Sequence, residues 1–474
     1  MLFTAPAFMF LFLPLSVFFL WAFGKKRKRQ TLLIVFAVYH IFLYIGQPQN
    51  LLYPLSLIFY CYGAILLSNQ KKMPKVASFL KHPAVFFVIC LLPYAALIAN
   101  HLLAYYGPRN FVYPTGLTVT VISSTCYLLE LRRAEKAQRQ SLLDLSLYLL
   151  FFPVKLVGPI LRYSDFCRLT RDDRLSVDMP SLATGARIFC LGVIKRIAIG
   201  APLLEAYGLF ARLAMESPDA VVMIYQMILI YFASFFALTG YLDIGIGIAA
   251  MLGIRMEREN KNPFRIASPL EYMRMLFGSV CDRVDELLVP YRKNGQWSRG
   301  WNFLRALILT SGVLLVIRPE WYVFVYSLFI ALFVWLCYCY RAKGKRRNRT
   351  AARVLGGLGT MAVLSVFWMM ATFGGVGEIL EYVSDMSVLH SEYHLNLILN
   401  AFSWIKYLFV ILMMIFVLHR KLGGRIGVGG HTSKVDGTTL GVTLILFALF
   451  LFTLVFFLPR YAVYNSMPFA FLYS

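Results

Sequence analysis

About a dozen apolar runs follow one another along the 474 residues of the chain, and each is close to the length that crosses a lipid bilayer. The runs cover about residues 5–23, 31–46, 51–68, 83–105, 113–131, 142–161, 219–252, 301–317, 321–340, 351–373, 399–418 and 438–458. A helix needs roughly 20 apolar residues to span the ~30 Å hydrocarbon core of a bilayer. With 59% hydrophobic and 15% charged residues, the chain also has too little polar surface for a soluble globule. The sequence therefore predicts an all-α, polytopic membrane protein.

Basic residues are concentrated in the short segments between these runs, and the net charge of the chain is +24. Clusters of Lys and Arg follow the first, third and fifth runs, whereas the alternate loops hold only Arg109. Because Lys and Arg are enriched in cytoplasmic loops, this pattern predicts a multi-pass protein whose N-terminus faces outside. The same distribution favours contact with anionic membrane lipids and argues against nucleic acid as a partner.

Three stretches do not fit the pattern of simple crossings. Residues 219–252 are too long for one straight crossing and are rich in glycine, which predicts two helical pieces, or one crossing and a buried half-helix. The glycines there predict close packing of helix backbones. Residues 183–206 carry two basic residues at their centre, and residues 263–299 are amphipathic. Both predict helices that lie in the inner interface or inside the protein without spanning.

Asp243 is an acidic residue within the apolar run 219–252. An unpaired carboxylate in hydrocarbon is energetically costly, so the sequence predicts that Asp243 is buried against Lys195, Arg196 or Arg162. A polar core of this kind serves either as a structural ion pair or as a substrate contact. The sequence leaves both roles open.

Several motifs occur in order along the chain. Residues 151–162 read FFPVKLVGPILR, residues 185–196 read GARIFCLGVIKR, and residues 240–247 read GYLDIGIG. Residues 8–15 (FMFLFLPL) and 466–473 (SMPFAFLY) add a match near each end. These segments resemble the membrane-bound O-acyltransferase (MBOAT) family, in particular its branch of alginate O-acetylation membrane proteins and teichoic acid D-alanyl transfer proteins.

The resemblance implies the family's fold, an assembly of about a dozen helices with interfacial and re-entrant helices. It implies a single polytopic domain over 1–474, with N-terminal transmembrane helices in 1–141, an MBOAT-like core in 142–340 and C-terminal helices in 341–474. It also implies a bacterial plasma membrane protein that transfers an acyl group from a thioester donor to a hydroxyl. The partners implied are other proteins of a surface-polysaccharide acylation system.

The resemblance also implies a catalytic histidine in a segment similar to L-W-H-G-x-x-W, and this chain departs from it. With Trp321 as the anchor, the base position falls on Ile317, and the upstream histidine of the family falls on Phe277. Neither side chain accepts a proton, and loss of a positioned base costs about 10²–10⁴ in rate. Among the seven histidines, only His40 lies well inside an apolar run, which makes it the fallback candidate for a base.

Three hypotheses for function follow. The first is an MBOAT-fold protein without its own catalytic base that takes part in O-acylation of a cell-surface polysaccharide or teichoic acid. The second is an active O-acyltransferase whose base has moved, and the third is a lipid or polysaccharide transporter. No metal site and no bound cofactor are predicted, since the cysteines are scattered and the order of His390, Glu392 and His394 is not that of a zinc motif.

Overall fold

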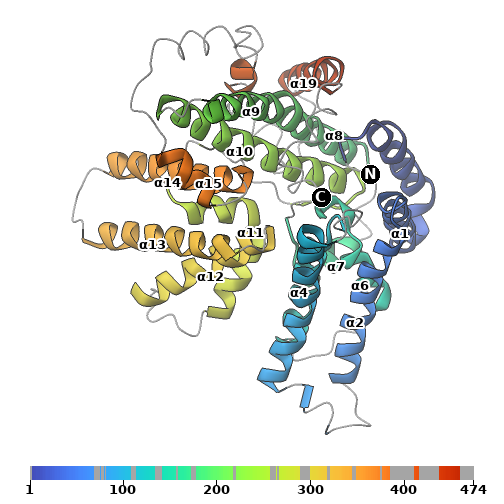
Figure 1. Ribbon diagram of the computed structural model, residues 1–474. Helices are drawn as coiled ribbons and strands as arrows, with labels where there is room; N and C mark the ends of the chain where they lie inside the picture. Colours follow the sequence, from blue (N-terminus) through green and yellow to red (C-terminus); the bar gives the residue numbers. More distant parts are fainter. Residues whose placement is uncertain are drawn as a thin grey trace.

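The computed structural model describes most of the chain as helices joined by short connections (Figure 1). The described residues are 3–68, 75, 79–80, 82–107, 114–133, 141–155, 159–171, 178–216, 220–256, 263, 266–288, 299–317, 321–343, 349–373, 376–384, 410–415 and 437–458. No strand occurs in this part of the chain, which confirms the predicted all-α class for the residues described. The predicted run at 399–418 lies mostly outside them.

The N-terminal helices and helical turns are η1 (Phe8–Phe12), α1 (Leu13–Leu43), η2 (Pro48–Leu51), α2 (Leu52–Ser68), α4 (Pro83–Tyr106), α5 (Leu117–Arg133), α6 (Leu142–Leu149), η3 (Phe152–Val154) and α7 (Tyr163–Arg171). The central elements are α8 (Met179–Val193), the π-helical segment η4 (Ile194–Gly200), α9 (Ala201–Glu216) and α10 (Ala220–Met251). The remaining helices are α11 (Pro269–Leu288), α12 (Arg299–Ile317), α13 (Trp321–Lys343), α14 (Arg349–Phe373), α15 (Val376–Ser384) and α19 (Gly437–Phe456).

The structure of α10 differs from the expected break within residues 219–252. It is one continuous helix of 32 residues, about 48 Å long at 1.5 Å per residue. The helix ends where Gly253 adopts a φ of +78°, a conformation that glycine takes without steric cost. Within the described part, α10 and the stretch Pro48–Leu67 are the two helices that are long and apolar enough to cross a membrane by length and composition alone.

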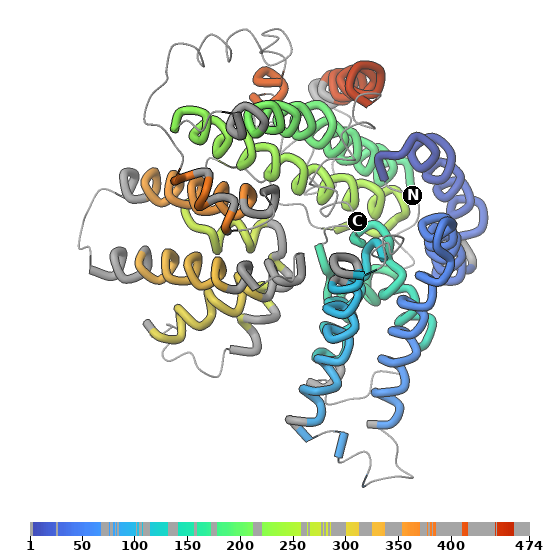
Figure 2. Tube along the Cα trace, viewed as in Figure 1, coloured from blue at the N-terminus to red at the C-terminus, as the bar shows by residue number. Residues whose placement is uncertain are grey.

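Helix α1 consists of two helices on either side of the basic residues, as expected, but no loop separates them. The two helices meet at a kink at Arg27, whose φ of −137° and ψ of 46° are not helical. Figure 2 shows the bent trace of α1, in dark blue, at the edge of the molecule. The basic residues therefore lie at the bend where the two helices of α1 meet.

The expected crossing over 142–161 is also corrected. Helix α6 has only eight residues, and after it the chain forms the short turn η3 and leaves helical conformation at 159–162. Pro153 explains the interruption in part, because proline lacks the backbone N–H that would continue the α-helical hydrogen bonds. The chain resumes as α7, whose first amides, at Tyr163 and Ser164, donate to the carboxylate of Glu130 on α5 at 3.0 and 2.9 Å.

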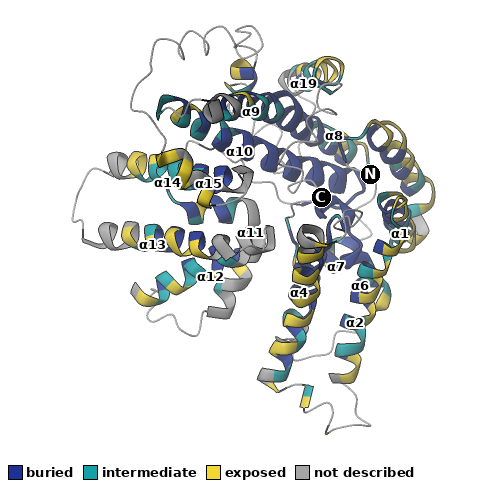
Figure 3. Cartoon of the chain, in the orientation of Figure 1, coloured by how far each residue is buried: buried dark blue, intermediate teal, exposed yellow. Residues whose placement is uncertain are grey.

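The core lies along α8, η4 and α10, which run across the middle of the molecule (Figure 1). Figure 3 shows that their residues are largely buried, whereas α2, α4 and α13 expose many residues. Residues 183–206 were expected in the interface or inside the protein, and the structure places residues 188–200 inside it. Helix α10 also packs on α9 and α14, and α12 packs on α13.

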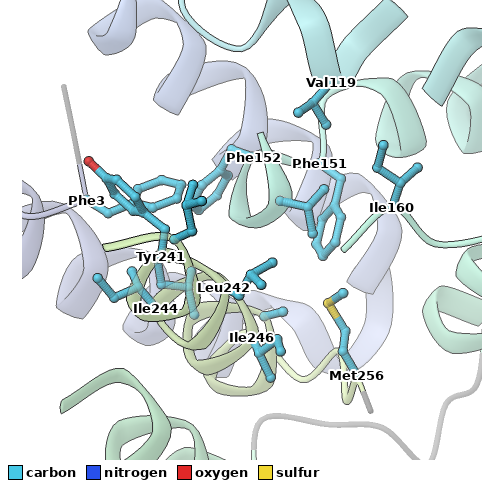
Figure 4. Packing of buried hydrophobic residues seen from close by; sticks show 14 of the residues in the cluster. Phe3, Val119, Phe151, Phe152, Ile160, Tyr241, Leu242, Ile244, Ile246 and Met256 are labelled. Atoms are coloured by element: carbon cyan, nitrogen blue, oxygen red, sulfur yellow. The ribbon is translucent and has the colours of Figure 1, made fainter. Parts of the chain in front are cut away.

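The turn η3 brings two of the sequence motifs together. Figure 4 shows Phe151 and Phe152 facing the interior near Tyr241 and Leu242 of α10. The ring of Phe152 stacks on that of Tyr39 from α1, with ring centroids 4.3 Å apart. The FFPVKLVGPILR and GYLDIGIG segments, nearly ninety residues apart in sequence, therefore share one hydrophobic core.

Candidate functional site

The centre of the molecule holds a buried ion pair between Lys195 and Asp243. Lys195 lies on η4, and its Nζ is 2.6 Å from Oδ2 of Asp243 on α10. The two side chains are only 7% and 6% exposed. The expected pairing of Asp243 with a basic residue is therefore confirmed, and Lys195 is a partner. Such a pair neutralises two charges that would each be costly in an apolar interior.

Arg196 follows Lys195 in the chain and is also buried, but it contacts a different group. Its Cζ lies 3.5 Å from the centroid of the Tyr241 ring, which is the geometry of a cation–π interaction. Tyr241 precedes Asp243 by two residues on the same helix, so two consecutive basic residues meet α10 at neighbouring positions. The third predicted partner, Arg162, is exposed on the segment that leads into α7.

Glycines allow α8 and α10 to approach closely enough for these contacts. A Cβ placed on Gly192 would lie 2.6 Å from the backbone nitrogen of Ile244, and one on Gly247 would lie 2.6 Å from that of Phe189. Gly185 and Gly240 meet the opposite backbone in the same way. The glycines of each helix are seven residues apart, so both lie on the contact face. The expected close packing of helix backbones is confirmed.

A second buried polar group lies around His40 of α1. His40 is 2% exposed, its Nδ1 is 2.7 Å from the carbonyl oxygen of Phe36, and its Nε2 has no hydrogen-bond partner among the described residues. Nearby on η3's C-terminal side, the buried Lys155 donates from Nζ to Oγ1 of Thr120 at 2.5 Å. Sequence reasoning did not single out Lys155. The signal that could have found it is a lysine in the middle of the apolar run 142–161.

Asp144 is another buried carboxylate that sequence reasoning did not single out. It lies on α6 with a side-chain exposure of 1%, and Arg29 of α1 donates to it at 2.9 Å. Arg171 of α7 donates to its other oxygen. The hydrogen bond with Asp144 raises the pKa of the Arg171 guanidinium above its usual value. Asp144 joins three helices, and an acidic residue within an apolar run was the available signal, as it was for Asp243.

The structure describes the backbone, but not the side chains, at the two positions that correspond to the family's histidines. Ile317 is the last residue of α12, and Phe277 lies in the middle of α11, two helices that pack on each other. Their side chains lie outside the described residues, and we predict that they line the space that holds the histidine in the family. The part of the chain that the structure describes contains no cluster of three His, Cys, Asp or Glu residues suited to a metal ion. His390 and His394 lie outside it.

Fold and site together define an all-α protein with charged residues paired inside an apolar helical core. Residues 79–303 match the sequence model of MBOAT, the membrane-bound O-acyltransferase family. This match covers the central helices and ends before residues 315–321, where the family's histidine segment is expected.

Two groups of curated relatives match parts of the chain. The first contains probable alginate O-acetylases AlgI: that of Pseudomonas aeruginosa is 24% identical over 287 residues (58% of this chain, 54% of the relative). That of Pseudomonas fluorescens is 25% identical over 283 residues (58% and 53%). The second is a peptidoglycan O-acetyltransferase of Helicobacter pylori, 25% identical over 187 residues (34% of each chain). The chain spans about half the length of the alginate O-acetylases it matches.

Over residues 79–303 the chain is therefore similar to the membrane-bound O-acyltransferase family, and it shows distant homology to these bacterial O-acetylases. A match to this family implies a polytopic membrane protein, in agreement with the class expected from the apolar runs.

Proposed function

We propose that this chain takes part in O-acylation of a cell-surface polysaccharide or teichoic acid as an MBOAT-fold protein without its own catalytic base. The observation that carries the proposal is the pair of residues at the histidine positions, Ile317 and Phe277. A hydroxyl that attacks an acyl thioester must lose its proton, and these side chains cannot take it. The relatives' names support the substrate class, since they act as alginate or peptidoglycan O-acetylases.

The buried charges of the core also support this proposal. The carboxylate of Asp243 is held by Lys195, and the guanidinium of Arg196 lies on Tyr241, so these groups contact one another inside the protein. A general base needs hydrogen-bond reach to the acceptor hydroxyl, and a carboxylate buried in an ion pair is poorly placed to provide it. We therefore assign Lys195, Asp243 and Arg196 to the stability and shape of the core.

In this proposal the acyl thioester donor is used by another protein of the same acylation system. The chain would lie in a bacterial plasma membrane with its N-terminus outside and would contribute lipid binding or the assembly of that system. No cofactor is required for this role.

A second candidate is an active O-acyltransferase whose base is His40. The observation that favours it is the Nε2 of His40, which has no hydrogen-bond partner among the described residues. The observation against it is burial, because an acceptor hydroxyl must reach an imidazole that is 2% exposed. The first proposal therefore accounts for more of the structure.

The test combines a deletion strain with the purified chain. We expect the surface polysaccharide of the strain to lose ester-linked acyl groups, and the purified chain to show no turnover of acetyl thioester with a hydroxyl acceptor above background. Full esterification in the deletion strain would reject a role in O-acylation. Turnover by the purified chain that His40→Ala abolishes would establish the second candidate.

Two control variants sharpen this test. His82→Ala removes a histidine that is exposed at the start of α4. It therefore shows whether loss of an unrelated histidine changes turnover. Ile317→His places an imidazole at the position of the family's base. If the site lacks only the base, this variant gains turnover, whereas a variant that stays silent shows that Phe277 or other groups must also change.

A further inference from the structure

A buried polar site lies where the end of α1 meets the start of α5 and the turn η3. Its residues are His40 of α1, Lys155 directly after η3 and Thr120 of α5, which are 2%, 3% and 2% exposed. The first two elements are tied together at this point, because the hydroxyl of Tyr44 donates to the carbonyl oxygen of Thr115 at 2.6 Å. We call the three residues His40, Thr120 and Lys155 the α1–η3 site.

The stem of Lys155 lies against the backbone at Gly116. A Cβ on Gly116 would lie 3.0 Å from Cδ of Lys155, and Gly116 has a φ of +79°, which glycine adopts without steric cost. From there Nζ of Lys155 donates to Oγ1 of Thr120 at 2.5 Å. The Thr120 hydroxyl donates its own proton to the carbonyl oxygen of Gly116 at 2.8 Å, so its lone pairs are free to accept from Lys155.

The amino group of Lys155 has more protons than this one acceptor satisfies. A lysine ammonium carries three protons and a neutral amine carries two, so in either state at least one proton of Nζ has no acceptor among the described residues. No carboxylate in the described part of the chain pairs with Lys155 either. The site therefore offers a buried donor.

The hydrogen bond of His40 fixes the tautomer of its imidazole. The carbonyl oxygen of Phe36 can only accept, so Nδ1, which is 2.7 Å away, carries a proton. Burial and the nearby Lys155 both disfavour a charge on the ring, so the imidazole is neutral and Nε2 has a lone pair. Nε2 has no hydrogen-bond partner among the described residues. The site therefore also offers a buried acceptor.

These two groups are complementary, since one has a proton to donate and the other has a lone pair. Polar groups buried in a protein nearly always have a hydrogen-bond partner, and an ordered water often supplies it. We propose that the α1–η3 site binds one water molecule, which accepts from Nζ of Lys155 and donates to Nε2 of His40. An anion accepts but does not donate, so it would face the lone pair of Nε2. A larger ligand with a hydroxyl would have to enter a site whose residues are almost fully buried.

The bound water occupies the atom of His40 that a general base would use. A base takes a proton on a free lone pair, and Nε2 is the only nitrogen of the neutral ring that has one. With water held there by Lys155, His40 links α1 to η3 and contributes to the stability of the fold. This role of His40 does not depend on the proposed role in acylation.

A crystal structure of the full-length chain, at a resolution that shows bound waters, tests the ligand directly. We expect one peak of electron density within hydrogen-bond reach of both Nζ of Lys155 and Nε2 of His40. Crystals grown in sodium bromide distinguish water from an anion, because bromide gives an anomalous signal. An anomalous peak at the site, a direct contact between the two nitrogens, or the absence of density between them would each overturn the proposal.

A double-mutant cycle, measured by denaturant unfolding in detergent, tests the same bridge by its energy. Lys155→Met leaves the acceptor of His40 without its donor, and His40→Phe leaves Lys155 without its acceptor. Each should raise the equilibrium constant of unfolding about tenfold. The double variant removes both groups, so its effect should be about tenfold smaller than the product of the single effects.

The matched control pair makes the same two changes at exposed positions. Lys75→Met and His82→Phe should have small effects that multiply, because no site joins these residues. Effects of Lys155→Met and His40→Phe that simply multiply in the same way would also overturn the proposal. If one of the buried variants does not fold, the crystal structure of the wild type still decides between water, an anion and a direct contact.

Discussion

Two regions of this molecule place basic residues within apolar sequence, and they stabilise the charges differently. At the junction of α8 and α9, Lys195 and Arg196 are buried and contact Asp243 and Tyr241 of α10. At the kink of α1, Arg29 is 40% exposed and contacts Asp144, which Arg171 also contacts. The comparison indicates that a buried charge requires a partner supplied by another helix. A charge at a bend near the surface is stabilised by hydration as well as by its partner.

The largest effect is expected where the buried pair is broken. Asp243→Leu leaves Lys195 buried opposite an apolar group, which should lower the free energy of unfolding by about 3–5 kcal/mol. The measurement is denaturant unfolding in detergent. The double variant Lys195→Met/Asp243→Leu removes both charges and should regain most of the loss. If Asp243→Leu is as stable as the wild type, water reaches Lys195 and the ion pair is not excluded from solvent.

The next effect tests the close approach that allows this pairing. Gly192→Ala places a Cβ within 2.6 Å of the α10 backbone, and such overpacking should cost about 1–3 kcal/mol. The matched control is Gly63→Ala on α2, where an added Cβ meets nothing within 4 Å. Because alanine is the better helix former, this control should gain about 0.5–1 kcal/mol. Equal effects of the two changes on unfolding would contradict the packing argument.

A smaller effect is expected at the kink of α1. Arg29→Gln removes one of the two arginines from Asp144, but Arg171 remains, and the partly exposed pair is screened by solvent. We therefore expect a loss of about 0–1 kcal/mol, well below that of Asp243→Leu. Raising the salt concentration should reduce this loss further. A loss of the same size as that of Asp243→Leu would remove the contrast between the two regions.

The smallest effect is a pH dependence at the start of α8. Burial raises the pKa of Asp178, but the hydrogen bonds from Ser181 and Arg255 lower it more, so the pKa lies below its usual value. The charge of Asp178 therefore stabilises the fold above that usual value, and the contribution disappears as pH falls through the lowered pKa. Asp178→Asn keeps a helix-capping side chain without the charge. The melting temperatures of wild type and variant should differ at pH 7 and converge in strong acid. Because Asp178 is 40% exposed, the difference should be small.

Part of the fold followed from the sequence because apolar runs of sufficient length have few alternatives to a helix in a membrane. The runs at 51–68, 83–105, 301–317 and 351–373 correspond to α2, α4, α12 and α14 within a few residues. The differences occurred at basic residues, at a proline and at glycines. A basic run can mark a kink between two helices without forming a loop, as in α1, and glycines can lie within a continuous helix when another helix covers them, as in α10.

For the candidate site, the sequence predicted which residues need a partner or a close contact, but it did not predict their positions. Asp243 had to be paired because of its apolar surroundings, and the glycines had to mark a close contact. Asp144 and Lys155 carried the same signal as Asp243, an ionisable residue in an apolar run, but they belong to a short helix and a turn that the run did not predict.

The sequence by itself determined that Asp243 needs a basic partner, that α8 and α10 present glycines at a spacing of seven, and that Ile317 stands at the histidine position. Only the tertiary structure decided that Lys195 binds Asp243 while Arg196 lies on Tyr241. The physical reason is the helical turn: consecutive side chains of a helix point in different directions, and which one faces α10 depends on how the two helices are rotated and set in register. That rotation is fixed by packing between distant segments, which no local pattern encodes.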